Sequence, residues 1–362
     1  MTNLHPELVR RDSRPIGEDK NEVRLFAVMR DEMLRLPFFL AYYRRLGVSR
    51  FFVIDNGSRD GLGEYLLEQP DCHLFFTNGS YAKSRAGVHW LNSLLDLYGE
   101  FHWILLADAD ELLVYPGVED ADLPRFCHWL SQSGYEALYA LLLDMYSALP
   151  IREVNYQQGD DFRTACPYHD GSYLTVRRYG LPAFPPFEHI GGPRLRLCFN
   201  EQNTPAVWPR LRVKLARRAL SAAHRAGFFK RHPAPAVATQ AFKVPLVKWR
   251  TGNAFINSHR LNPVKLAPVT GALLHFKYFQ DFSGRIDDAI RSGEHYAGSA
   301  EYRRYAELLA RDPNLSLADA GSVRYGSSQK LIDRGLIRTD AEWTSERSIA
   351  MTSGRPLTCS HR

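Results

Sequence analysis

The chain carries two carboxylates, Asp108 and Asp110, directly after an apolar run at residues 103–107. The length and flanks of this run are typical of a buried parallel strand. Because side chains alternate along a strand, we expect both carboxylates on one side of its carboxyl end, where open α/β sheets bind their ligands. At about 4–5 Å, two such charges repel by roughly 3–4 kcal/mol at an effective dielectric constant of about 20. The pair therefore indicates a divalent cation with oxygen ligands, Mg²⁺ or Mn²⁺.

The same segment has two other interpretations. Asp110 and Glu111 could cap whatever element follows the strand. Asp108 could also be the phosphorylated nucleophile of a haloacid-dehalogenase-type phosphatase, with Asp110 as its acid. Members of that family carry the motif after the first strand and usually have Thr or Val two residues later. Here it follows the fourth expected strand and Leu112 stands at that position, so the phosphatase is a minor alternative.

Strand and helix patterns alternate through the region that ends at this motif. We expect strands at 22–29, 50–54, 73–77 and 101–107, and helices at 38–46, just after 61, and at 81–98. Pro37 suits a first helical turn, Gly47 a helix end, and Asp60 an N-cap. This alternation at short spacing predicts a doubly wound, mostly parallel α/β sheet with helices on both faces.

Changes in pattern divide the chain into five expected parts. They are a flexible leader at 1–20, a first half at 21–150, a second half at 151–281 with a basic insertion at 202–240, a helical tail at 282–345 and a flexible tail at 346–362. In the second half and just before it, residues 137–143, 242–249 and 272–276 are strand candidates. Residues 282–310 have a charged, helical pattern.

Composition narrows the class of protein. With 362 residues and 45% hydrophobic content, the chain can bury a large core. Its longest apolar run, 137–143, is far too short to span a bilayer, and residues 1–20 lack the apolar core of a signal peptide. Five scattered cysteines, none in C-x-x-C spacing, indicate neither a disulfide framework nor a structural zinc. We expect the cytoplasm as location.

The net charge of +6 is unevenly distributed, because residues 202–280 contain no Asp or Glu. Within this block, the basic residues at 209–231 follow an amphipathic helical pattern. Such a helix could lie peripherally on an anionic membrane surface, at the inner membrane face, or surround an acidic ligand. Nucleic acid is not expected as a partner, because no recognised nucleic-acid-binding motif accompanies the charge.

A second polar group follows the strands expected at 50–54 and 73–77. Asp55 could accept hydrogen bonds from a base or ribose, and the turn that begins at Asn56-Gly57 lets backbone approach a ligand closely. Arg85 could contact phosphate. Simpler explanations remain open, because Asn-Gly is common turn chemistry and a lone arginine usually lies on the surface.

Together these segments resemble the family 2 glycosyltransferases with the GT-A fold, and within that superfamily a bacterial branch. The segments that carry the resemblance are MRDE at 29–32, FFLAYYRRLG at 38–47, FFVIDNGSRDG at 51–61 and WILLADADELL at 103–113. The branch's later landmarks are LDMYS at 143–147, CPYHD at 166–170, GGPRLR at 191–196, KVPLVKW at 243–249 and GALLHFKY at 271–278. The match covers roughly residues 22–305. It departs at Arg85-Ala86, where the family has Arg-Asn, and at Asp31-Glu32, where it has Asn-Glu.

The resemblance implies transfer of a sugar from a nucleotide-diphosphate donor, often UDP-linked, to a hydroxyl of a saccharide or lipid-linked acceptor. Envelope or capsular polysaccharide or glycolipid synthesis would be the setting. The half at 21–150 would bind nucleotide sugar and metal, and 151–281 would face the acceptor. Asp55 would bind the nucleoside, and the metal ligands would be Asp108, Asp110 and His275, with His259 as a second candidate histidine.

The resemblance also implies roles for further charged residues. Other donor-binding candidates are Glu32, Asn56, Arg85, Asp108, Arg194, Arg196 and Lys248, and Lys277 could also screen the diphosphate. The mostly inverting mechanism of this family needs a carboxylate base for the acceptor proton, here Asp170, with Asp144 and Glu188 as alternatives. The departures from the motif and the basic segment also motivate a different class, a non-catalytic nucleotide-, sugar- or membrane-binding protein with a transferase-like fold.

Overall fold

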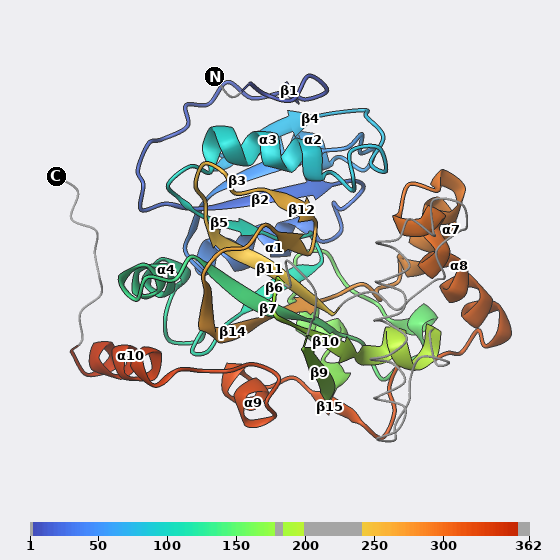
Figure 1. The fold of residues 1–362 in the computed structure, drawn as a ribbon. Helices are drawn as coiled ribbons and strands as arrows, with labels where there is room; N and C mark the ends of the chain where they lie inside the picture. The colour runs from blue at the N-terminus through green and yellow to red at the C-terminus, as the bar shows by residue number, and fades with distance from the viewer. Residues whose placement is uncertain (1–2, 178–183, 199–240, 354–362) are drawn as a thin grey trace, which may run out of the picture.

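The computed structural model describes residues 3–177, 184–198 and 241–353 (Figure 1). Its centre is a nine-stranded sheet with the order β1-β4-β3-β2-β5-β11-β7-β14-β6. The strands are β1 (Val9–Arg10), β2 (Val23–Met29), β3 (Val48–Asp55), β4 (Cys72–Phe76), β5 (Trp103–Leu106), β6 (Glu111–Val114), β7 (Ala137–Asp144), β11 (Phe242–Lys248) and β14 (Leu266–His275). Of these, β1, β11 and β6 run against the other six. The predicted α/β class and mostly parallel sheet are thus confirmed.

Helices cover both faces of this sheet. One face packs against α1 (Leu36–Arg45), α2 (Leu62–Glu68) and α4 (Leu123–Gln132), and the other against α3 (Val88–Tyr98). Alternation along β2 serves both faces, because Leu25 enters the first apolar cluster whereas Phe26 enters the second. Burial on two sides explains why these strands are almost continuously apolar. The layering is consistent with the doubly wound arrangement that we predicted.

A third apolar cluster joins the second half of the chain to the C-terminal helices. In it, β10 (Phe187–Gly191) and the π-helical turn η2 (Arg194–Cys198) meet α7 (Phe282–Ser292) and α8 (Tyr296–Arg311). The last two helices, α9 (Ser328–Asp333) and α10 (Ala341–Ser353), pack into the first cluster instead. The remaining short elements are η1 (Ile151–Glu153), α5 (Phe162–Ala165), β8 (Tyr168–Asp170), β9 (Tyr173–Arg177), β12 (Phe255–Asn257), β13 (Arg260–Leu261) and β15 (Ser322–Arg324).

Most predicted elements are present with shifted bounds. The helix expected at 81–98 begins only at Val88, because Arg85 and Ala86 have φ values of 54° and 58°, which a right-handed helix does not allow. Asp60 is not the N-cap of α2, which is Gly61, although its carboxylate accepts the backbone N–H of Leu62 at 3.2 Å. Residues 272–275 of the strand expected at 272–276 belong to the longer β14, which ends at His275.

The ends of the chain differ from expectation. Within the expected flexible leader, β1 pairs with β4, and Asp12 accepts the backbone N–H of Leu74 at 2.9 Å. Helix α10 continues to Ser353, into the expected flexible tail at 346–362. The basic insertion at 202–240, with the segment at 209–231, lies outside the described residues. No helix within the described ranges is long and apolar enough to cross a membrane.

Candidate metal and donor site

Sheet register brings the central residues of the candidate site together. His275, the last residue of β14, lies opposite Asp144 of β7 on one side and Glu111 of β6 on the other. Because directly paired residues point to the same face of a sheet, these side chains must lie next to one another. Two backbone hydrogen bonds secure the strand ends, from Phe276 N to Asp110 O at 2.7 Å and from Met145 N to His275 O at 2.9 Å.

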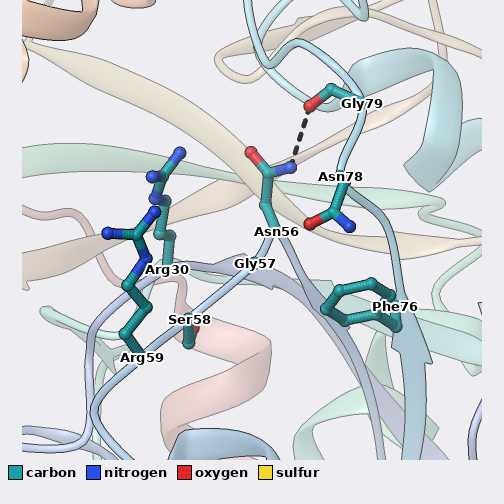
Figure 2. Close-up of a pocket in the computed structure, with 8 residues that line it drawn as sticks. All are labelled: Arg30, Asn56, Gly57, Ser58, Arg59, Phe76, Asn78 and Gly79. Atoms are coloured by element: carbon teal, nitrogen blue, oxygen red, sulfur yellow. Dashed lines mark hydrogen bonds between the residues drawn. The ribbon is translucent and has the colours of Figure 1, made fainter.

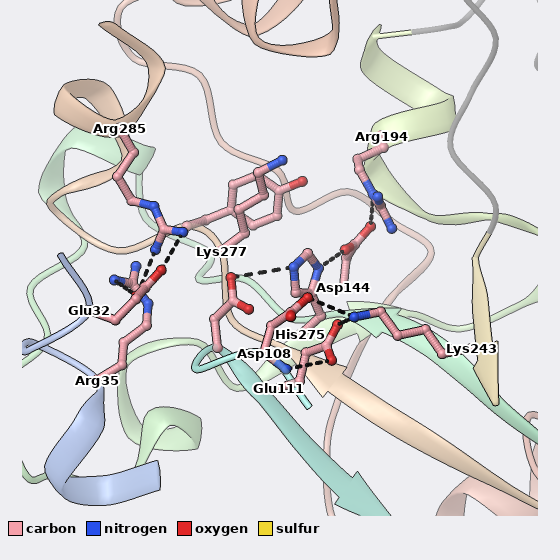
Figure 3. Close-up of polar contacts among 12 residues, drawn as sticks. Glu32, Arg35, Asp108, Glu111, Asp144, Arg194, Lys243, His275, Lys277 and Arg285 are labelled. Atoms are coloured by element: carbon pink, nitrogen blue, oxygen red, sulfur yellow. Dashed lines mark hydrogen bonds and ion pairs between the residues drawn. The ribbon is translucent and has the colours of Figure 1, made fainter. Parts of the chain in front are cut away.

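Asp110, Glu111 and His275 form a buried cluster with metal-ligating atoms. One such atom from each residue lies within 4.8 Å of the others, and His275 Nε2 is 3.4 Å from Asp110 Oδ2. Figure 3 labels Glu111 and His275 of this cluster. Helix α1 supports this arrangement, because the Tyr43 hydroxyl donates to the carbonyl oxygen of Glu111 at 2.9 Å. The group could hold a metal ion, as two carboxylates and an imidazole are common ligands of divalent cations.

Asp108 lies beside this cluster and pairs with a lysine. Strand β5 ends at Leu106, so Asp108 and Asp110 belong to the turn before β6, and strand alternation does not govern their directions. The Asp108 side chain is 51% exposed and accepts a hydrogen bond from Lys243 Nζ at 2.7 Å. Glu111, which we did not predict, occupies the place in the cluster that we had expected for Asp108.

Lys243 is a site residue that the sequence analysis did not identify. Strand β11 runs antiparallel to its neighbours, so its first residues reach the edge where the parallel strands end. There the buried ammonium contacts Asp108 and, at 2.6 Å, Glu111 Oε1. Lys248, which we predicted as donor-binding, lies at the other end of β11, opposite Trp103 at the start of β5, and therefore at the opposite edge of the sheet.

The charges of the site, three of them on buried carboxylates and one on the half-exposed Asp108, do not cancel. Four carboxylates, those of Asp108, Asp110, Glu111 and Asp144, face two permanent cations, Lys243 and Arg194. With a neutral histidine and all four carboxylates ionised, this leaves two negative charges, which one divalent cation would neutralise. Burial raises the pKa of Glu111 to about 7, so the count applies above that pH. In the metal-free protein, burial lowers the pKa of His275, but Asp110 and Asp144 outweigh burial and raise it to about 9. In the metal-free protein, the second proton on His275 therefore offsets part of the negative charge that a bound metal ion would offset.

A network of arginines and acids adjoins Asp110. Glu32 contacts Arg35 at 3.2 Å and Arg285 at 2.8 Å (Figure 3). Arg35 also contacts Asp281 at 2.7 Å. Burial raises the pKa of Asp110, but His275 and then these two arginines lower it below its ordinary value. The helical tail thus contributes Arg285 to the site, which its sequence pattern did not indicate. Glu32, predicted as donor-binding, holds these arginines in the structure.

A cavity of about 360 Å³ opens where β3 and β4 end. It is lined by Arg30, Asn56, Gly57, Ser58, Arg59, Phe76, Asn78 and Gly79, which Figure 2 labels. The Asn56 amide donates to the carbonyl oxygen of Gly79 at 3.0 Å. Asp55 is buried and accepts the backbone N–H of Ser58 at 2.8 Å, so it shapes the turn that lines the cavity.

The remaining predicted residues have other surroundings. Asp170 accepts hydrogen bonds from Arg196 at 2.9 Å and from the Tyr146 hydroxyl at 2.6 Å. Arg196 also contacts Asp319 at 3.2 Å, so it joins β8 to the segment before β15. Glu188 is buried on β10.

Three further residues also lie outside the metal-ligating cluster. His259 contacts the carbonyl oxygen of Phe242 through Nδ1 at 2.7 Å. Lys277 pairs with Glu301 at 3.0 Å. Arg85 is exposed in the turn before α3.

Comparison with known proteins does not extend this description, because neither a protein-family model nor a curated protein matches the chain. The resemblance to family 2 glycosyltransferases therefore stays a prediction from motifs. Three features of the described residues bear on function: the buried cluster, the neighbouring arginines and the cavity. All three lie at the edge of the sheet where its parallel strands end.

The pKa of His275 predicts how stability depends on pH. In the folded, metal-free protein it is about 9, against 6.5 for an ordinary histidine, so folding binds a proton. This stabilisation is complete below pH 6.5 and is lost as the pH rises through 9. We expect the free energy of unfolding in EDTA to fall by on the order of 3 kcal/mol across that window. Urea unfolding of the wild type and of His275→Gln measures it, with exposed His128→Gln as control. Equal pH dependence in all three proteins would contradict the assignment.

The cluster also predicts that a divalent cation stabilises the folded protein. Mn²⁺ at about 100 times its Kd should add about 2.7 kcal/mol to the wild type, because the unfolded chain lacks the site. Asp110→Asn removes a charged ligand and should abolish the gain. Asp160→Asn removes an exposed carboxylate and should retain it. Thermal melts with Mn²⁺ or EDTA provide the measurement, and an unchanged gain in Asp110→Asn would refute the site.

Proposed function

We propose that the protein is a metal-dependent glycosyltransferase that moves a sugar from a nucleotide-diphosphate donor to an acceptor hydroxyl. The observation that carries the proposal is the buried Asp110–Glu111–His275 cluster at the carboxyl edge of the parallel strands. Ligands of α/β sheets bind at this edge, and a hard cation there coordinates phosphate oxygens readily. The motifs supply the reaction type, with polysaccharide or glycolipid synthesis as its setting and UDP as the favoured carrier.

The order of the strands suggests how a nucleotide-sugar donor would be oriented between the cavity and the metal-ligating cluster. The cavity follows β3 and β4, the metal-ligating cluster follows β5 and β14, and β2 lies between β3 and β5 in the sheet. We infer that the nucleoside occupies the cavity, where Phe76 offers an aromatic face and the asparagine amides offer hydrogen bonds. The diphosphate would then cross the end of β2 towards the cluster, past Arg30.

Charge governs the chemical step. A divalent cation, Mn²⁺ or Mg²⁺, held by Asp110, Glu111 and His275 would stabilise the departing diphosphate as a Lewis acid. Lys243 contributes by offsetting part of the negative charge of Asp108 and Glu111, which would otherwise repel the phosphates. Arg285, whose side chain is 27% exposed and rests on Glu32, is a second cation within this region. Burial keeps these charges in a medium where they act more strongly than in water.

A non-catalytic nucleotide-binding protein is the second candidate. The observation in its favour concerns the general base, because Asp170 and Asp144 each already hold an arginine. Saturable, metal-dependent UDP binding without turnover, across a panel of nucleotide sugars and saccharide acceptors, would favour this candidate. Turnover of any donor in that panel would exclude it.

The central test is loss of transfer when the cluster is altered. In Mn²⁺, the wild type should hydrolyse or transfer at least one sugar from a panel of UDP-linked donors. Asp110→Ala and Glu111→Gln should lower kcat at least about 100-fold, because leaving-group charge loses its stabilisation. Asp160→Asn should keep the wild-type kcat. EDTA should abolish the activity of both the wild type and this variant. Full activity of Asp110→Ala, with its fold verified by circular dichroism, would refute the proposal.

The cavity predicts a separable effect on nucleotide affinity. Arg30→Ala or Arg59→Ala should each weaken UDP binding about 10- to 100-fold, since a hydrogen bond to a charged group contributes about 1.5–3 kcal/mol. Mn²⁺ affinity should not change, because neither arginine belongs to the cluster. Arg291→Ala, at a side chain that is 77% exposed on α7, is the matched control. Calorimetric titration of UDP distinguishes these outcomes, and wild-type affinity in both variants would place the nucleotide elsewhere.

A further inference from the structure

We propose that Asp144 is the positioning residue for His275, holding its ring so that Nε2 faces the cation. This inference rests on the metal site of the proposed function and deepens it. The two residues are direct partners in the parallel pairing of β7 and β14, so their proximity follows from sheet register. Asp144 Oδ1 lies 2.6 Å from His275 Nδ1, and both side chains are buried (Figure 3).

The hydrogen bond determines which ring nitrogen can bind a metal. A carboxylate only accepts, so the proton at this contact belongs to Nδ1 of His275. A neutral imidazole carries one proton, which leaves the lone pair on Nε2. Nε2 is the nitrogen that lies 3.4 Å from Asp110 Oδ2, on the side of the cluster. Asp144 therefore selects the tautomer whose free nitrogen points to the metal-ligating group.

Asp144 is itself held in place. Its second oxygen accepts a hydrogen bond from Arg194 Nε at 2.7 Å, and the side chain is 1% exposed. The turn at Gly192, with a φ of 86°, comes so close that a Cβ there would lie 3.4 Å from Asp144 Oδ2 and 2.8 Å from the Tyr173 hydroxyl oxygen. Both oxygens are thus engaged and enclosed. Asp144 acts through His275 and does not reach an acceptor hydroxyl.

The test is the affinity of Mn²⁺ alone, measured by calorimetry without donor or acceptor. Asp144→Asn keeps the shape of the side chain and removes its charge. The Kd for Mn²⁺ should rise about 10–100-fold, which is the usual effect of losing the hydrogen-bond partner of a metal-ligating histidine. Asp71→Asn is the matched control, because Asp71 also accepts from an arginine, Arg44, but lies before β4 at the far edge of the sheet. A Kd for Asp144→Asn within about twofold of the control would overturn the inference.

A second measurement uses the wild-type protein, so it does not depend on whether an Asp144 variant folds. Nitrogen-15 NMR of the full chain with Zn²⁺, a diamagnetic ion that binds imidazole, reports the protonation of each ring nitrogen. The His275 signals are assigned by their loss in His275→Gln. We expect a protonated Nδ1 and a metal-bound Nε2. Protonation at Nε2, or metal on Nδ1, would overturn the inference.

The two proposals can fail separately. A wild type that binds Mn²⁺ and shows the expected tautomer, yet transfers no sugar, contradicts the glycosyltransferase proposal alone. A wild type with Mn²⁺-dependent transfer, whose Asp144→Asn variant binds Mn²⁺ as tightly as the control, contradicts the role of Asp144 alone.

Discussion

The pairing of β14 with β7 on one side and β6 on the other is the constraint on which the site depends. It places His275 between Asp144 and Glu111, and the backbone bond from Phe276 adds Asp110. Burying several charges costs more than their mutual attraction returns unless each has a partner. Lys243 pairs with Glu111 and Arg194 pairs with Asp144, which offsets part of this cost. The remaining negative charge lies where a cation could bind.

The mixed character of the sheet matters for this balance. In a parallel sheet, the strands present only their carboxyl ends at the ligand-binding edge. Strand β11 runs the other way, so the same edge also receives the beginning of a strand, and with it the ammonium of Lys243. Chain direction thus decides which lysine of the segment 243–249 reaches the acids and which lies at the far edge.

Local pattern was sufficient for the core strands, because runs such as 51–54 and 103–106 are apolar on both faces. It also indicated Asp110, which follows the apolar end of β5, whereas His275 at the end of β14 was named only because the family resemblance implied a C-terminal histidine ligand. It failed where long-range pairing decides. Strand β6 is short and follows the acidic motif at once, so Glu111 looked like a cap, and no sequence pattern shows that Arg285 of α7 folds back onto Glu32.

The metal-ligating residues come from two segments that are far apart in the chain, a tight turn with the start of β6 and the end of β14. Before the sheet closes, no cation could contact them together. An ion bound there would therefore link the outermost strand, β6, to its neighbour β14, and its release would remove that link. Occupancy of the site would then depend on the integrity of this strand pair.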